Sequence, residues 1–277
     1  MMGRSQAGLL RAFKALAKRA PGVSGLVRQR DELRRERDEL WQERNELRRE
    51  LESLQVHEGC QKSFALWGED RILDWVFLNR PSGFFVDVGA YHPTVHSNTK
   101  LLSDRGWTGI SVDCNPAMIA HHRKVRPRDV SLNLAVGMTE GPIGVYFFND
   151  WATSNTVAPA WAAATTRAQG IAVTSEIRVE SWPLRKVLER HLPTGTEVDL
   201  LNVDVETLDL EVLQSNDWAR FRPLVVAIED MEFDPAEPAS SPTFRFLRDL
   251  GYRLFSRTIF TNFFADEARR AELNGCP

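Results

Sequence analysis

The chain has 277 residues, of which 43% are hydrophobic, and its formal net charge at pH 7 is -3. This length allows one domain with a substantial core plus an appendage, and the acidic balance argues against a nucleic-acid-binding protein. Three scattered cysteines, Cys60, Cys114 and Cys276, exclude a disulfide framework and a thiolate metal site. Since no apolar run reaches the roughly 18–20 residues that cross a bilayer, and no secretory hydrophobic core follows the N-terminus, we expect a cytoplasmic protein.

Residues 1–22 predict a basic amphipathic helix. The first 30 residues contain seven Lys or Arg residues and no acid, and the apolar side chains between Leu9 and Ala20 fall on one helical face. Such a helix can contact an anionic membrane surface through residues 1–20, which would make the protein peripheral there. It can also pack against the protein's own body or a partner chain, or act as an organelle-targeting peptide.

Residues 23–58 predict a coiled coil or a single solvated helix. Leucines recur every seven residues, at Leu26, Leu33, Leu40, Leu47 and Leu54. The position four residues later, which should be apolar in a strong coiled coil, holds Arg30, Arg37 and Arg44 before Leu51 restores the pattern. We therefore expect a helical arm that associates weakly into a homo-oligomer, or else one stabilised only by its own Glu–Arg pairs.

Residues 59–277 predict a globular α/β domain that opens with a strand–turn–helix–strand unit. A helix is expected within residues 63–77, followed by a buried strand at 84–88 that carries Asp87. Gly89 and Ala90 permit a tight turn, and a helix capped by Ser97 is expected next. The second strand, at 109–112, ends at Asp113.

The middle of the domain alternates shorter elements with one long polar segment. We expect a helix at 116–123, strands at 130–136 and 143–148, a short strand at 177–179 and a helix at 183–191. The segment 150–170 between them is rich in small and polar residues and predicts a loop that acts as a lid or acceptor-binding segment.

The last part repeats the logic of the first unit. A strand at 198–205 carries Asp204 and is followed at once by Glu206, and a strand at 224–228 ends in Glu229 and Asp230. Helices at 208–213 and 244–250 and a hairpin of strands at 252–256 and 258–264 complete the pattern. Because carboxyl ends of parallel strands share one edge, these acids should line a single nucleoside-binding site. The turn after Asp87 lacks the glycine triplet of dinucleotide binders, which favours S-adenosylmethionine over a pyrophosphate cofactor.

Several motifs together resemble the FkbM family of S-adenosylmethionine-dependent methyltransferases. They are VDVGAYHPTVHSNTKLLSDRGWTGISVDCNP (86–116), RPRDVSLNLAVG (126–137), SNT (154–156), LLNVDVETLDLEVL (200–213) and RPLVVAIE (222–229). The resemblance implies a class I methyltransferase (Rossmann-like) fold, a seven-stranded sheet with one antiparallel strand, preceded here by the N-terminal helical coiled-coil arm. It also implies O-methylation of sugars, glycolipids or related natural products. The sequence departs from the family at Thr207, where Gly is common, and at Leu66, where Gln is common.

The resemblance also implies roles for particular residues. Asp87, Gly89 and Ala90 would form the cofactor turn, which Ser97 and Asn98 would help to fix. Asp113 would bind the ribose, and Asn133 and Ala135 would border the adenine.

Methyl transfer to a hydroxyl requires removal of its proton, and Glu206 and His92 are the candidate catalytic bases. Asp230 is a further candidate, and His92 could instead bond to the backbone. Three carboxylates, Asp204, Glu229 and Asp230, would suit a Mg²⁺ ion, in a manner that resembles magnesium-dependent macrolide sugar methyltransferases. The alternative is that Asp204 orients a ligand while Glu229 and Asp230 bond to loop amides. Two other functions remain open, a nucleotide-dependent oxidoreductase and a non-catalytic coiled-coil adaptor.

Overall fold

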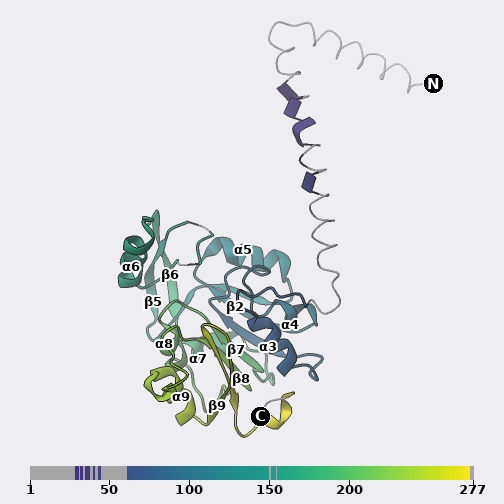
Figure 1. The fold of residues 1–277 in the computed structure, drawn as a ribbon, viewed down its shortest axis with the longest axis vertical. Helices are drawn as coiled ribbons and strands as arrows, with labels where there is room; N and C mark the ends of the chain where they lie inside the picture. The colour runs from purple at the N-terminus through teal and green to yellow at the C-terminus, as the bar shows by residue number, and fades with distance from the viewer. Residues whose placement is uncertain are drawn as a thin grey trace, which may run out of the picture. The chain divides into compact units, whose positions relative to one another are not determined.

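The computed structural model describes residues 61–149, 151–153 and 155–274, together with residues 29–30, 32–33, 35–37, 40 and 43–44 (Figure 1). Ser63–Pro277 form one compact unit. The predicted basic helix at 1–22 lies outside the described residues, as do Leu26, Leu47 and Leu54 of the heptad pattern. The described residues between 29 and 44 are helical, with Leu33 and Leu40 exposed. Coiled-coil association therefore stays a prediction. Among all described residues, no helix combines the length and the apolar character that a membrane span needs.

A seven-stranded sheet forms the centre of this unit. Its strand order is β3-β2-β1-β7-β8-β10-β9, and only β10 runs antiparallel to its neighbours. The strands are β1 (Phe84–Val88), β2 (Thr108–Asp113), β3 (Val130–Asn133), β7 (Leu200–Val203), β8 (Val225–Glu229), β9 (Tyr252–Arg257) and β10 (Thr261–Asp266). The expectation of seven strands with one antiparallel strand is confirmed.

Helices cover both faces of this sheet. The helices described in the whole unit are α3 (Glu69–Val76), α4 (Lys100–Asp104), α5 (Pro116–Val125), α6 (Pro159–Gln169), α7 (Leu184–His191), α8 (Asp209–Gln214) and α9 (Pro242–Asp249), with short 3₁₀ turns at Pro238–Ser240 and Arg270–Glu272. Successive residues of a strand point to opposite faces. Accordingly Val86 packs in one hydrophobic cluster with residues of α7, α8 and α9, whereas Phe85 packs in another with residues of α3 and α4.

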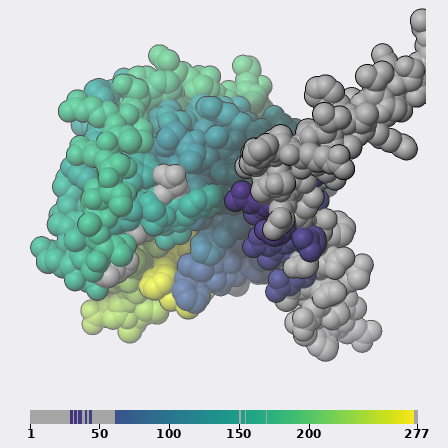
Figure 2. Space-filling view, turned by 90° about the horizontal axis from the view of Figure 1, so that it is seen from above, coloured from purple at the N-terminus to yellow at the C-terminus, as the bar shows by residue number. Residues whose placement is uncertain are grey.

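The predicted strand at 130–136 is divided between two sheets, which corrects that expectation. After Asn133 the chain leaves the main sheet, and β4 (Ala135–Val136) pairs with β6 (Ser175–Trp182) in a second sheet that also contains β5 (Gly141–Phe147). Ala135, Val145 and Val179 bury one face of this small sheet in a cluster of its own. Figure 2 gives a view from above, in which the teal and green segments around this sheet make up much of the visible face.

The predicted loop at 150–170 contains the helix α6, a second correction. Pro159 occupies its first turn and Gly170 ends it with a left-handed φ of 69°. Both are ordinary helix boundary signals, and the run between them is rich in alanine. Similarly, α4 begins at Lys100, and Ser97 does not cap it. The Ser97 hydroxyl accepts a hydrogen bond from Arg126 instead.

Gly89 provides a test of how tightly this architecture is packed. Its φ is 83°, and a Cβ atom there would lie 1.7 Å from the backbone oxygen of Asp204. Gly195 has a similar φ of 79° but no atom within 4 Å of the same position. We expect Gly195→Ala to lose about 1 kcal/mol of unfolding free energy from backbone strain alone. Gly89→Ala should lose at least twice as much, because β1 and β7 must separate.

Thermal and urea unfolding of both variants and the wild type measures these losses. Equal losses in the two variants would contradict the close packing of the Gly89 turn on Asp204.

Candidate functional site

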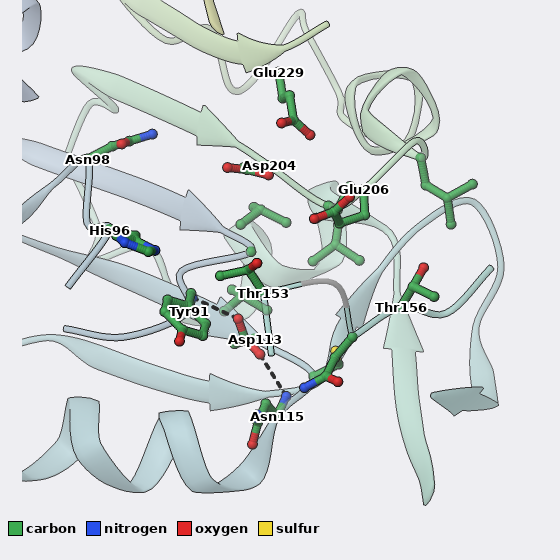
Figure 3. Close-up of a pocket in the computed structure, with 18 of the residues that line it drawn as sticks. Tyr91, His96, Asn98, Asp113, Asn115, Thr153, Thr156, Asp204, Glu206 and Glu229 are labelled. Carbon is green, nitrogen blue, oxygen red and sulfur yellow. Dashed lines mark hydrogen bonds between the residues drawn. The ribbon is translucent and has the colours of Figure 1, made fainter. Parts of the chain in front are cut away.

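A cavity of about 310 Å³ lies at the carboxyl ends of the parallel strands. Gly89, Asp113, Asp204 and Glu229, which end or follow β1, β2, β7 and β8, all line it. This is where the sequence placed a ligand site, since open α/β sheets bind ligands at this edge. Figure 3 shows Asp204, Glu206 and Glu229 gathered at one end of the cavity and Asp113 at the other.

Gly89 and Ala90 form the predicted tight turn. Their backbone N–H groups both donate to the Val112 carbonyl, at 2.9 and 3.1 Å, so the turn is attached to β2. Only Gly89 lines the cavity; Ala90 is buried beside it. The turn therefore brings backbone, without a side chain, against the cavity.

Asp87 lies behind the cavity and does not line it. Its carboxylate accepts hydrogen bonds from the Thr99 hydroxyl at 2.7 Å and the Asn202 amide at 2.9 Å. Burial raises its pKa, and the two hydrogen bonds and the charge of Arg126 oppose that shift. Asp87 consequently connects β1 with β7 and with the start of α4.

Ser97 and Asn98 belong to the same buried network. The Arg126 guanidinium donates to the Ser97 and Thr99 hydroxyls, and Asn98 donates its amide to Asn202 at 3.1 Å. Asn98 also lines the cavity, whereas Ser97 does not. The prediction that these two residues help to fix the turn agrees with their positions.

Asp113 occupies the end of the cavity near β2. Its carboxylate accepts the backbone N–H groups of Tyr91 at 2.8 Å and Asn115 at 2.7 Å (Figure 3). Burial raises its pKa to about 6, so at neutral pH it is mostly ionised and can accept further hydrogen bonds. The fixed carboxylate is suited to receive hydroxyl donors from a ligand.

An apolar wall stands near Asp113. Leu134, Ala135 and Val136 line the cavity, which agrees with the expected position of Ala135. Asn133 does not line it: its side chain is exposed and donates to the Asp113 backbone carbonyl. Asn133, assigned to the adenine together with Ala135, therefore lies outside the cavity lining, and the next residue, Leu134, lines it instead. The chain leaves the main sheet directly after Asn133.

The opposite end of the cavity is strongly acidic. Glu69, Asp204, Glu206 and Glu229 line it, and Asp209 is buried next to them. Burial raises the pKa of Asp204, and repulsion from Glu229 and Glu206 raises it further. Burial likewise raises the pKa of Glu229 and of Glu206. The pKa of Asp209 rises to about 8, through burial and then the charge of Asp204.

Glu206 and Thr207 have left-handed backbones, with φ of 57° and 81°. Such values are unfavourable for residues with a side chain, and most of all for a β-branched one such as Thr207. Strain of this kind often accompanies functional loops. Here it places the Glu206 carboxyl group in the cavity.

The three-carboxylate magnesium site is not formed. Asp204 and Glu229 share a hydrogen bond in the cavity, but Asp230 does not line it and accepts the Ser241 hydroxyl at 2.6 Å. Among the described residues, no group of three His, Cys, Asp or Glu side chains is arranged to hold a metal ion. The sequence showed that Asp230 follows Glu229, but consecutive residues at a strand end point in different directions.

His92 also lies outside the cavity. Its Nδ1 atom accepts the backbone N–H groups of Thr94 at 3.2 Å and Val95 at 3.1 Å, and its ring contacts His121 and Trp151. This favours backbone bonding, the alternative role, over catalysis. The histidine of this loop that does line the cavity is His96, whose φ is 52°.

Tyr91 also lines the cavity, and its hydroxyl donates to the Trp151 carbonyl at 2.8 Å. That contact holds the segment 151–157 near the cavity, which Thr153 and Thr156 line; Ser154 lies outside the described residues. No local pattern singles out Tyr91 or His96, because both reach the cavity through left-handed backbone angles, with φ of 43° and 52°.

Comparison with known proteins identifies one family. The family model described as the Methyltransferase FkbM domain matches residues 87–254, which is more than half of the chain. No curated protein and no solved structure gave a match.

The buried acids predict that stability falls as pH rises. A carboxyl group whose folded pKa exceeds its unfolded value keeps its proton longer in the folded state, so the free energy of unfolding decreases between the two values. For Asp209 this interval runs from 3.8 to about 8. Asp209→Asn keeps an acceptor for the Val205 N–H. It should raise Tm by several degrees at pH 8 and by much less at pH 5.

Differential scanning calorimetry across this pH range measures the effect. Asp217→Asn is the matched control, because Asp217 also accepts a backbone N–H but lies near the surface. A gain in Tm for Asp209→Asn that did not depend on pH would show that the ionisation of Asp209 is not its cause.

Thr207→Gly should relieve the backbone strain at φ 81°. Glycine adopts this conformation freely, so we expect a gain of about 1 kcal/mol, or a rise in Tm of roughly 2–4 °C. Thr194→Gly, at an exposed position whose φ is not positive, should instead lower Tm. If Thr207→Gly lowered Tm as much as this control does, the left-handed backbone of Thr207 would not be a source of strain.

Proposed function

The chain belongs to the FkbM methyltransferase family, and from this membership we propose that it is an S-adenosylmethionine-dependent O-methyltransferase. Its acceptor is a hydroxyl group of a saccharide, glycolipid or glycosylated natural product. The observation that carries the proposal is one cavity with the Asp113 carboxylate at one end and an acidic group of side chains at the other. These two ends fit the two halves of a cationic nucleoside.

The chemistry of the lining residues supports this cofactor. Among the described residues that line the cavity, none is Lys or Arg. A pyrophosphate would meet carboxylates without any basic side chain, which is unfavourable. A sulfonium and an ammonium group would instead be attracted by them. The oxidoreductase alternative therefore loses support.

Particular residues would hold the cofactor. Asp113 would accept the ribose hydroxyls, because its carboxylate is fixed by two backbone N–H groups. Leu134, Ala135 and Val136 would contact the adenine. Asp204 would attract the positively charged part. When bound, S-adenosylmethionine supplies a methyl group activated by its sulfonium.

Glu206 is the residue that we propose as the general base. It lines the cavity on the acidic side, and burial raises its pKa above that of an ordinary glutamate, which makes its carboxylate a better acceptor of a hydroxyl proton. The proton of the acceptor hydroxyl would pass to its carboxylate as the new O–C bond forms. Residues 152–153 and 155–157, which line the cavity, would limit the access of water.

Two substitutions should separate binding from transfer. Asp113→Asn removes a charged hydrogen-bond acceptor, so we expect S-adenosylmethionine to bind roughly 10–100-fold more weakly. Glu206→Gln removes the base, so we expect the dissociation constant to change little while kcat falls by about 100-fold or more. Isothermal titration and a labelled-methyl transfer assay measure the two effects.

Asp234→Asn, at an exposed site, is the control and should match the wild type in both assays. Absence of S-adenosylmethionine and S-adenosylhomocysteine binding by the wild-type protein would refute the proposed function. Unchanged turnover in Glu206→Gln would refute only the assignment of the base.

A further inference from the structure

The acidic end of the cavity holds more negative charge than the proposed cofactor can balance. Its four carboxyl side chains and that of Asp113 line the cavity, and no described lining residue is Lys or Arg. S-adenosylmethionine carries one ammonium, one sulfonium and one carboxylate group, so it supplies a single net positive charge. The remaining carboxylates must either stay protonated or face another cation.

One oxygen of the Glu229 carboxyl group lacks a donor, although Glu229 shares a hydrogen bond with Asp204. Its Oε2 atom is shielded from solvent and has no hydrogen bond in the structure. By contrast, Glu69 accepts the Trp67 backbone N–H at 2.9 Å and the Thr258 hydroxyl at 2.7 Å. A buried carboxylate oxygen without a donor is costly, and such groups in native proteins usually await a ligand or water. The Glu229 side chain is only partly buried and lines the cavity, so a ligand there can contact its carboxyl group.

Two aromatic side chains, Trp67 and Phe260, also line the cavity. Phe260 lies next to Glu229 where β8 and β10 pair, because Thr261 is paired with Glu229 and the Asp230 N–H donates to the Phe260 carbonyl at 2.8 Å. The rings of Trp67 and Phe260 meet edge to face, with centroids 6.1 Å apart. Trp67 remains 46% exposed, and Met231 beside the same opening is 39% exposed. Large apolar side chains left open next to carboxylates are unusual unless a ligand covers them. Among the described cations, none lies over the Trp67 or Phe260 ring.

We propose that the acceptor carries an ammonium group, as an amino sugar does, which binds between Glu229 and the Trp67–Phe260 pair. An ammonium group combines hydrogen-bond donors for the Glu229 carboxylate with a charge that aromatic faces attract. The hydroxyl group of the acceptor then lies on the side of Glu206. The same arrangement rejects phosphorylated and carboxylated acceptors. This proposal rests on the proposed function, because it assigns the acceptor of the same site.

The raised pKa of Glu229 fits a side chain that a cationic ligand would bind. Burial and the neighbouring acids disfavour its ionised form, and a bound ammonium group would reverse that effect.

Cyclohexylammonium and cyclohexanol are suitable probes because they have the same ring and differ in charge. Their effects on the Tm of the full chain are measured with saturating S-adenosylhomocysteine and without it, at equal ionic strength. We expect cyclohexylammonium to bind at least ~10-fold more tightly than cyclohexanol. Glu229→Gln and Trp67→Ala should each bring the ratio of the two affinities close to one.

Matched controls are Glu237→Gln and Trp75→Ala, since both residues are exposed and neither lines the cavity. They should keep the full preference. Equal binding of the two probes, or a preference that survives Glu229→Gln, would overturn the proposal. Failure of S-adenosylhomocysteine to bind would instead count against the proposed function, while the measurement without it would still decide the cation site.

Discussion

The buried carboxylate of Asp87 is the interaction on which the cavity depends. It lies at the centre of the sheet and connects Asn202 on β7 with Thr99 at the start of α4. Arg126 extends the same network through Thr99 and Ser97. A buried charge is tolerated only when its lone pairs are satisfied, so each of these partners is constrained by the others. The loop that carries Tyr91, His96 and Asn98 into the cavity is held by this network from behind.

The cavity itself is shaped by backbone conformations that side chains normally avoid. Gly89 allows β1 to turn against the end of β7, and the left-handed backbones of Glu206 and Thr207 follow at the end of β7. The result is a small space in which carboxyl groups gather, with no Lys or Arg among the described residues that line it. Such an arrangement costs stability in the unliganded protein, and it is suited to a positively charged ligand. The negative charge of these carboxyl groups would then select both the cofactor and the acceptor.

Much of this organisation could be read from local patterns. The apolar runs that end in Asp113, Asp204 and Glu229 predicted parallel strands whose acids meet at one edge, because parallel strands share that edge by geometry. The split at Leu134 and the helix α6 were missed. A continuous apolar run does not show where a chain changes sheets, and a small-residue segment resembles a loop unless its Pro and Gly boundaries are given weight.

The sequence alone determined which strands end in acids, the family resemblance and the sheet edge at which the cavity lies, because these depend on hydrophobic periodicity and on motifs along the chain. Only the tertiary structure decided which polar residues enter the cavity. Asp87 and Asp113 both lie at strand ends, yet one is enclosed in a network and the other faces the cavity. His92 and Asp230 lie outside it, while His96 and Glu69 line it. The physical reason is that side-chain direction depends on backbone angles and on partners distant in sequence, and neither is written in local composition.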